Sequence, residues 1–376
     1  MEKIFVVSKE VFNDYHDKKE INNFFNNLIN NGNLLVIISR DEKYINEKRE
    51  KNKHKNLRYA TRNRFLNLLK EFKDSTSKFI VIGNRDQDFQ MAVNYKILYL
   101  VPVWCKYVYE KSSQYGICVK NLEQLDQIVK TIKNQENWYY EEELPDGTKI
   151  YSLISGMTRS WDVTMEEREL VSGFEDFLKR GNIDYYEILY YHFLAGISNK
   201  QEFRDINYWG IAPSSGVNLN ANMLKFKDRA RCMMKSQMSR KNDNLIYRHT
   251  AVDKSHTKDN KLREKIGAEL HFASIHLSPN YDVRGKNICI FDDYLTHGNT
   301  FEAIRNLLRK AGANKIIFVS LGRFGRPYIY QDYEITGDVY TPSGFNYKLI
   351  NREYIPYRCN NNARDEVRNL HEIFNL

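Results

Sequence analysis

Short apolar runs of strand length alternate with longer, more polar segments through the first part of the chain. The apolar runs lie at 3–7, 33–39, 78–83 and 96–103. The polar segments have the length of helices and lie at 17–32, 42–73 and 121–134, where 42–73 is expected to form one long charged helix. Strands that alternate with helices in this way are typical of a parallel sheet covered on both faces. The sequence therefore predicts an α/β fold for this part.

The same alternation returns in the second part of the chain. Strand patterns lie at 206–213, 286–293 and 315–322, with a helix pattern at 299–311. Between the two parts, 138–155 reads as two strands joined by a Pro-Asp-Gly turn, which predicts a hairpin, and helical periodicity covers 164–197. A chain of 376 residues is long enough for two domains. We expect domains at 1–137 and 201–376, with a connecting hairpin and helices at 138–200.

Composition excludes several classes of protein. No apolar run reaches the roughly 18 residues that a membrane-spanning helix needs. The first residues carry charges and lack the layout of a secretory signal, so a cytoplasmic protein without a membrane partner is expected. The 5 cysteines are widely spaced and form no C-x-x-C pair, which argues against a disulfide framework and against a zinc site.

The positive charge of the chain is concentrated in one segment. Residues 221–265 contain 13 Lys and Arg against 5 Asp and Glu, an excess of +8 in a chain whose net charge is +9. Such a segment can hold a small polyphosphate or a nucleic-acid backbone, or it can be a solvated face. These alternatives stay open on charge alone.

The strongest candidate site lies at 287–313. An apolar strand, 288–291, ends at two adjacent carboxylates, Asp292 and Asp293. A polar turn then leads into an amphipathic helix and contains Thr296, His297, Gly298, Asn299 and Thr300. Ligands bind at the carboxyl ends of parallel strands, and a helix N-terminus with glycine and hydroxyl groups suits a phosphate. The carboxylates suggest ligand hydroxyls or Mg²⁺ beside that phosphate; the alternative is a strand–turn–helix that carries an Asp pair by chance.

The segment IFDDYLTHGNTF resembles the phosphoribosyl-diphosphate (PRPP) motif of type I phosphoribosyltransferases. The resemblance implies the phosphoribosyltransferase fold for the C-terminal domain. It also implies that Asp292 and Asp293 hold the ribose hydroxyls and help to place Mg²⁺, while residues 296–300 bind the 5′-phosphate. His297 stands where the family usually has threonine.

Three further segments extend the resemblance. Pro213, Ser214, Ser215 and Gly216 occupy the position of the family's pyrophosphate loop. Residues 246–273 resemble the mobile catalytic loop, most closely that of the competence-protein (ComF-like) type, which ranks Lys254 and Arg263 first among the loop cations. The strand-rich piece 333–357 is the expected hood over the acceptor, where its aromatic side chains either stack a base or fill a small core.

The chemistry implied by the resemblance is substitution at ribose C1 with loss of pyrophosphate. Enzymes of the family that act on 6-oxopurines have an acid where this chain has Thr296, so hypoxanthine–guanine activity is disfavoured. No residue in the sequence identifies the acceptor.

The N-terminal domain resembles a haloacid-dehalogenase-like (HAD) phosphatase that has lost its chemistry. The first strand ends at Ser8 and Glu10 in place of the family's D-x-D, and the second strand ends at Ser39. The later acidic motif reads 83-GNRDQD-88, with Asn84 in place of an aspartate and Asp88 retained. Without the nucleophile, phosphatase turnover is not expected, although Ser8, Ser39, Asp88 and a lysine such as Lys70 can still hold a phosphate. A Rossmann-like domain outside that family is the alternative.

Two functions of different classes follow. The first is an Mg²⁺-dependent phosphoribosyltransferase that uses PRPP and an unidentified acceptor. The alternative is a non-catalytic module that senses PRPP or a related phosphorylated nucleotide, as an effector in a bacterial stress or phage-defence system. Binding of nucleic acid through 221–265 or 42–73 is not favoured, and homo-oligomerisation is left open.

Overall fold

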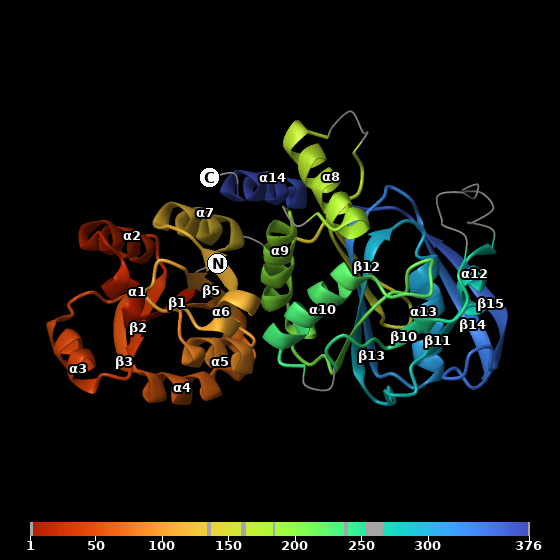
Figure 1. Cartoon of the computed structure of the whole chain (residues 1–376), viewed down its shortest axis with the longest axis horizontal. Helices are drawn as coiled ribbons and strands as arrows, with labels where there is room; N and C mark the ends of the chain where they lie inside the picture. Colours follow the sequence, from red (N-terminus) through yellow and green to blue (C-terminus); the bar gives the residue numbers. More distant parts are fainter. Residues whose placement is uncertain are drawn as a thin grey trace.

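Six parallel strands form the first sheet, in the spatial order β3-β2-β1-β4-β5-β6 (Figure 1). The structure is a computed structural model that describes residues 3–133, 137–158, 163–182, 185–236, 240–252 and 266–374. The strands are β1 (Ile4–Ser8), β2 (Leu34–Ser39), β3 (Leu57–Thr61), β4 (Phe79–Ile82), β5 (Leu98–Pro102) and β6 (Ile117–Val119). The strand order reverses direction between β1 and β4, and such a reversal opens a crevice at the carboxyl ends of the two strands.

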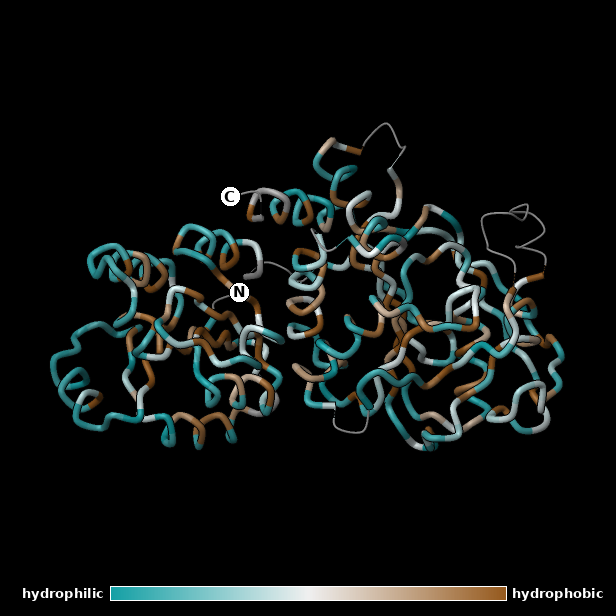
Figure 2. The backbone as a smooth tube through the Cα atoms, in the orientation of Figure 1, coloured by the Kyte–Doolittle hydropathy of each residue, from teal (hydrophilic) through white to brown (hydrophobic). Residues whose placement is uncertain are grey.

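Helices cover both faces of this sheet, as the sequence predicts. They are α1 (Lys9–Asp14), α2 (Lys18–Asn30), α3 (Glu42–Lys51), α4 (Arg62–Glu71), α5 (Asp86–Tyr95), α6 (Glu110–Tyr115) and α7 (Leu122–Lys133), with a 3-10 turn, η1 (Lys73–Lys78), before β4. The single long helix expected at 42–73 is wrong, because β3 separates α3 from α4. β3 lies at the sheet edge and contains the charged Arg58 and the polar Thr61, and only Ile45 of α3 is buried. Figure 2 accordingly draws α3 mostly in the hydrophilic colour.

The second sheet has the order β7-β8-β13-β12-β9. Its strands are β7 (Tyr140–Glu143), β8 (Lys149–Ser155), β9 (Tyr208–Ile211), β12 (Asn287–Leu295) and β13 (Lys315–Arg323). All pairs are parallel except β7 with β8, which form the hairpin predicted at 138–155. This hairpin contributes two strands to the second sheet, although the sequence suggested a connecting role.

Alternate residues of β12 face two different cores. Cys289 and Phe291 face a core that includes α8 (Met165–Arg180), α9 (Tyr186–Asn199) and α10 (Ala221–Met233). Ile288 and Ile290 face the other core, which includes residues of α12 (Glu269–Phe272) and α13 (Asn299–Lys310). Asp292 and Asp293 therefore follow a strand that is fixed from both sides, because side chains of a strand alternate between its faces.

Two small antiparallel hairpins and a final helix complete the chain. The hairpins are β10 (Ile246–Arg248) with β11 (Ile275–Leu277), and β14 (Tyr328–Gly337) with β15 (Phe345–Ile355), while η2 (Gln201–Phe203) precedes β9. α14 (Asn362–Phe374) returns to pack against α7 and α8 (Figure 1). Within the predicted hood, the rings of Tyr333 and Tyr347 lie 4.9 and 4.8 Å from that of Phe272, which favours the small-core alternative for these aromatics.

α9 joins the two sheets into one hydrophobic core. Tyr186 and all side chains from Ile188 to Ser198 are buried, and the core that contains them runs from β1 to β13 without a break. In the part of the chain that the structure describes, no helix is both long enough and apolar enough to cross a membrane.

Candidate functional site

The turn between β12 and α13 has a backbone that only glycine adopts easily. Gly298 has φ +84° and forms the N-cap of α13, and a Cβ atom at this position would overlap the ring of Tyr328. The Tyr328 hydroxyl donates to the buried carboxylate of Glu302, one turn into the helix. The turn is therefore held tightly against α13, with the first N–H groups of the helix directed towards the end of β12.

The two carboxylates at the end of β12 are partly exposed and next to each other. The Asp293 N–H donates to Asp292 Oδ1 at 2.9 Å, and the Tyr294 N–H donates to Asp293 Oδ1 at 2.6 Å. Burial raises the pKa of Asp292 well above its usual value, the negative charge of Asp293 raises it further, and nearby Arg248 lowers it. This concentration of negative charge is suited to a cation or to ligand hydroxyl groups.

A chain of hydrogen bonds connects the loop after β9 to the first turn of α13. Arg248, at the end of β10, is 4% exposed; its Nε donates to the Ser214 carbonyl at 2.6 Å, and its Nη2 donates to His271 Nδ1 at 3.2 Å. Because arginine can only donate, His271 Nδ1 is the acceptor, and the neutral ring carries its proton on Nε2. His271 Nε2 lies 3.4 Å from Thr300 Oγ1 and donates to it, which leaves the Thr300 hydroxyl proton for a ligand.

The loop predicted to bind pyrophosphate lies beside the carboxylates. It follows β9, and the Ala212 N–H donates to the Phe291 carbonyl at 2.7 Å, directly before Asp292. Pro213 is buried, Ser214 and Gly216 are exposed, and the Val252 N–H donates to the Ser215 carbonyl at 2.9 Å. The basic segment 221–265 therefore adjoins this loop at Val252.

The predicted site residues are brought together only in part. The β12 carboxylates, the loop 213–216 and Thr300 share one edge of the second sheet. His297 instead donates from Nδ1 to the Pro327 carbonyl at 3.1 Å, and Asn299 Oδ1 accepts from Gln331 at 3.2 Å. Lys254 and Arg263 lie outside the described residues.

Arg248 and His271 are functional candidates that sequence reasoning did not single out. Both lie within the segment 246–273, in which the sequence ranks only Lys254 and Arg263. Their contacts with Ser214 and Thr300 span 34 and 29 positions of sequence, so no local pattern could have indicated them.

Mg²⁺ fits this edge of the sheet as an ion that arrives with a ligand. Among the described residues, no three His, Cys, Asp or Glu side chains gather as a metal site. Mg²⁺ commonly takes one or two carboxylates and completes its shell with phosphate oxygens and water. Asp292 and Asp293 offer such a pair, and a cation between them would offset the repulsion that raises the pKa of Asp292.

The first sheet carries a second cluster, at the crevice between β1 and β4. Asp88 is fully buried; its Oδ1 accepts from the Ser8 hydroxyl at 2.7 Å and from Arg62 Nη1. Its Oδ2 accepts from the Asn84 and Arg85 N–H groups at 3.1 and 3.0 Å. Arg62, the first residue of α4, is 6% exposed and also donates to Ser8 Oγ at 3.3 Å.

A divalent cation does not fit this second cluster. The guanidinium of Arg62 already supplies the positive charge beside Asp88, and all of the Asp88 oxygen atoms have partners. Lys70, proposed from sequence as the phosphate-binding lysine, lies on the exposed surface, where it donates to Asn67. Arg62 takes the place expected for that lysine, and sequence reasoning missed it because 42–73 was taken as one helix.

Two other residues of the predicted degenerate site, Ser39 and Asn84, form hydrogen bonds with the backbone near the same sheet edge. Ser39 Oγ accepts from the Asp41 N–H at 3.0 Å, and Asn84 Nδ2 donates to the Tyr107 carbonyl at 2.5 Å. Within the described part of the chain, the Oδ1 atom of Asn84 and the Oε2 atom of Glu10 are buried without a hydrogen-bond partner.

A comparison of the sequence with models of known protein families finds no match. A search of curated proteins likewise finds no similar sequence. The residues and geometry of the two sheet edges are therefore what indicates the function of the chain.

Proposed function

We propose that the second half of the chain is a type I phosphoribosyltransferase-like domain. It binds PRPP with Mg²⁺ and transfers the phosphoribosyl group to an acceptor, with release of pyrophosphate. The observation that carries the proposal is the Asp292–Asp293 pair directly before the Gly298 turn, with Thr300 oriented by His271 and Arg248.

The roles of the residues follow from their positions. The 5′-phosphate lies against the N–H groups of the Gly298 turn and accepts the Thr300 hydroxyl proton, while Asp292 and Asp293 accept hydrogen bonds from the ribose hydroxyls. Mg²⁺, when bound, neutralises charge on the diphosphate. Arg248 supports the pyrophosphate loop through the Ser214 carbonyl, and burial lowers its pKa to about 10, so it stays charged at neutral pH.

The reaction is a displacement at ribose C1. An electron pair of the acceptor forms the new bond to C1 while the C1–O bond to the diphosphate breaks, and that bond's electron pair leaves with pyrophosphate. Negative charge grows on the leaving group, so fixed positive charge around loop 213–216 lowers the barrier.

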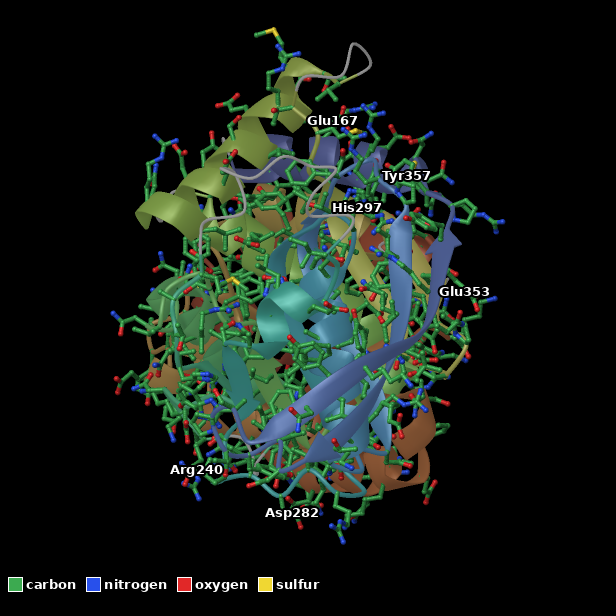
Figure 3. All side chains as sticks on the ribbon, turned by 90° about the vertical axis from the view of Figure 1, so that its right-hand side faces the viewer. Glu167, Arg240, Asp282, His297, Glu353 and Tyr357 are labelled. Atoms are coloured by element: carbon green, nitrogen blue, oxygen red, sulfur yellow. The ribbon has the colours of Figure 1, made fainter. Side chains whose placement is uncertain are left out.

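Calorimetry with PRPP and Mg²⁺ tests the proposal. Wild-type protein is expected to bind, and the double variant Asp292→Asn/Asp293→Asn is expected to lose at least about tenfold in affinity, because charge-assisted hydrogen bonds contribute about 1.5–3 kcal/mol each. Asp282→Asn is the matched control, because Asp282 is exposed and lies at the opposite end of this half of the molecule from His297 (Figure 3). Absence of binding by wild type, or equal binding by the double variant, refutes the proposal.

We further propose that the first half is a degenerate HAD-like domain without phosphatase activity. The support is the position of Ser8 at the end of β1, where a nucleophilic aspartate is expected, and the ion pair between Arg62 and Asp88. Hydrolysis of p-nitrophenyl phosphate above the background of a Ser8→Ala variant would contradict it.

A sensor that binds PRPP without transfer is the second candidate. The continuous core through α9 favours it, because a ligand that stabilises the second sheet also stabilises the helix packed against the first. Pyrophosphate release separates the two functions: an enzyme releases it with an acceptor, whereas a sensor binds PRPP and releases none.

A further inference from the structure

Arg323 is a buried cation without a counter-charge. It is the last residue of β13 and is 0% exposed. Its Nη2 donates to the Arg326 carbonyl at 3.0 Å, while Nε and Nη1 have no hydrogen-bond partner among the residues that the structure describes. Its guanidinium carbon lies 3.7 Å from the centre of the Tyr140 ring and 5.5 Å from that of Tyr357. Two tyrosine faces therefore surround a charge that no carboxylate of the described residues pairs with.

The other arginine that is 0% exposed is paired with carboxylates. Arg305 of α13 forms ion pairs with Glu302, Asp146 and Asp332, at 2.8, 2.6 and 3.0 Å. A buried charge is strongly disfavoured unless it is paired, and contact with aromatic rings compensates for only a part of the lost hydration. The two unpartnered nitrogen atoms of Arg323 therefore indicate an anion that is supplied from outside the chain.

Arg323 lies one strand away from the proposed ligand edge. It pairs with Leu295 in the β12–β13 register, and the Phe324 N–H donates to the Leu295 carbonyl at 2.9 Å. The loop 324–327 that follows is hydrogen-bonded to the Gly298 turn, because His297 donates to the Pro327 carbonyl. His297 and Tyr357 both lie in the upper part of the view in Figure 3.

We propose that Arg323 lies in the acceptor site and that the acceptor is a planar aromatic carboxylate. This inference rests on the proposed transferase function and specifies its second substrate. The carboxylate would accept from the free Nε and Nη1 atoms, and the aromatic ring would stack on the tyrosines. A neutral nucleobase satisfies these requirements less well, because it leaves the buried charge unpaired.

The covering groups define how such an acceptor enters. Tyr357 is partly exposed, and its hydroxyl contacts that of Tyr139. Residues 325–327 are exposed, and Gly325 packs near Met157 and Tyr357. Because Arg323 is 0% exposed, entry of the acceptor would require Tyr357 and this short loop to move.

A pyrophosphate-release assay with Mg²⁺ and PRPP tests the acceptor class. The panel pairs aromatic carboxylates (orotate, nicotinate, quinolinate and anthranilate) with neutral bases (adenine, guanine, hypoxanthine, uracil and cytosine). At least one carboxylate is expected to support release and the neutral bases are not. Arg323→Met is expected to lower kcat/KM for that carboxylate by about 100-fold, because it removes one partner of a buried charge pair.

Control variants separate this inference from a structural role of Arg323 and from the proposed function. Arg323→Lys keeps the positive charge and should retain the preference for carboxylates. It keeps the inference testable if Arg323→Met does not fold. Arg284→Met, an exposed position far from the site, should leave release unchanged. Release with a neutral base, or none with any carboxylate, overturns the inference if PRPP still binds by calorimetry. Loss of PRPP binding by wild type overturns the proposed function itself.

Discussion

Asp88 is a buried carboxylate whose negative charge is compensated by the guanidinium of Arg62. Its two oxygen atoms accept four hydrogen bonds, and the guanidinium is the only charged donor among these four. Removing one partner of such a pair leaves an uncompensated buried charge and costs about 3–5 kcal/mol. We therefore expect Arg62→Ala to lower the free energy of unfolding in urea by an amount in this range.

Lys70→Ala is the control for Arg62→Ala, because Lys70 is an exposed cation on the same helix, α4. Its effect should stay within about 0.5 kcal/mol. The double variant Arg62→Met/Asp88→Asn should recover part of the loss, since neither charge remains buried. Equal effects of Arg62→Ala and Lys70→Ala would contradict an ion pair that stabilises the first sheet.

Asp292 predicts a pH dependence of the opposite sign from that of a paired carboxylate. Burial and Asp293 raise its pKa in the folded state, so the folded state holds the proton to a higher pH than the unfolded chain does. Stability is then lost as pH rises from the unfolded value through the raised folded value. Asp292→Asn removes this loss, so the variant should be more stable than wild type at pH 8, with a smaller difference at pH 4.

Urea unfolding of wild type and Asp292→Asn at several pH values measures this difference, and Asp282→Asn serves as the control for removing a charge. A difference that does not change with pH would show that Asp292 titrates alike in both states. If the expected sign is found, the carboxylate is retained at the expense of stability, as ligand-binding groups commonly are.

At the scale of elements, the buried strands could be predicted and the edge strand could not. β1, β2, β4 and β5 are continuous apolar runs, because helices cover both faces of the sheet. β3 pairs on one side only and contains charged and polar residues, so its sequence continues the pattern of the flanking helices. The role of Arg62 could not be predicted either, because Arg62 reaches Asp88 only by following directly after β3.

The candidate site divides in the same way. The strand–turn–helix of residues 287–310 is local, and its type and order follow from apolar spacing, one glycine and the polar turn. Arg248, His271 and Arg323 take part through contacts between distant elements, which periodicity does not encode. The sequence could therefore indicate the sheet edge at which we propose that a ligand binds, while the groups proposed to orient that ligand could be found only in the tertiary structure.

The turn before α13 gives a prediction about glycine. Gly298→Ala introduces both a positive-φ residue and a clash with the Tyr328 ring, so it should cost more than the roughly 1–2 kcal/mol of the backbone term alone and weaken PRPP binding. Gly285→Ala is the matched control, because Gly285 has φ +67° with no atom near its Cβ position. Urea unfolding and calorimetry measure both effects. Similar losses for the two variants would argue against the fixed turn.

At the scale of the whole molecule, the two sheets share their stabilising contacts. α9 is buried along most of its length, and hydrogen bonds join it to the elements of the first sheet: Lys3 Nζ donates to Asn199 Oδ1 at 3.0 Å, and Tyr190 donates to the Tyr115 carbonyl at 2.8 Å. Arg204 reaches the Tyr95 carbonyl at 3.1 Å. Neither sheet can lose its fold without exposing apolar surface of the other, which favours a single cooperative unfolding transition.

This cooperativity can be measured as ligand-linked hydrogen exchange. Mg²⁺ and PRPP at about 100 times the dissociation constant should add about 2.7 kcal/mol to the free energy of global unfolding. The most protected amides exchange through global unfolding, so those of β1 and β4 should slow together with those of β12, although the ligand touches only the second sheet. The variant Asp292→Asn/Asp293→Asn should show neither effect. Slowing confined to residues 140–355 would instead mean that the first sheet unfolds independently, and a sensor that acts through α9 would lose its physical basis.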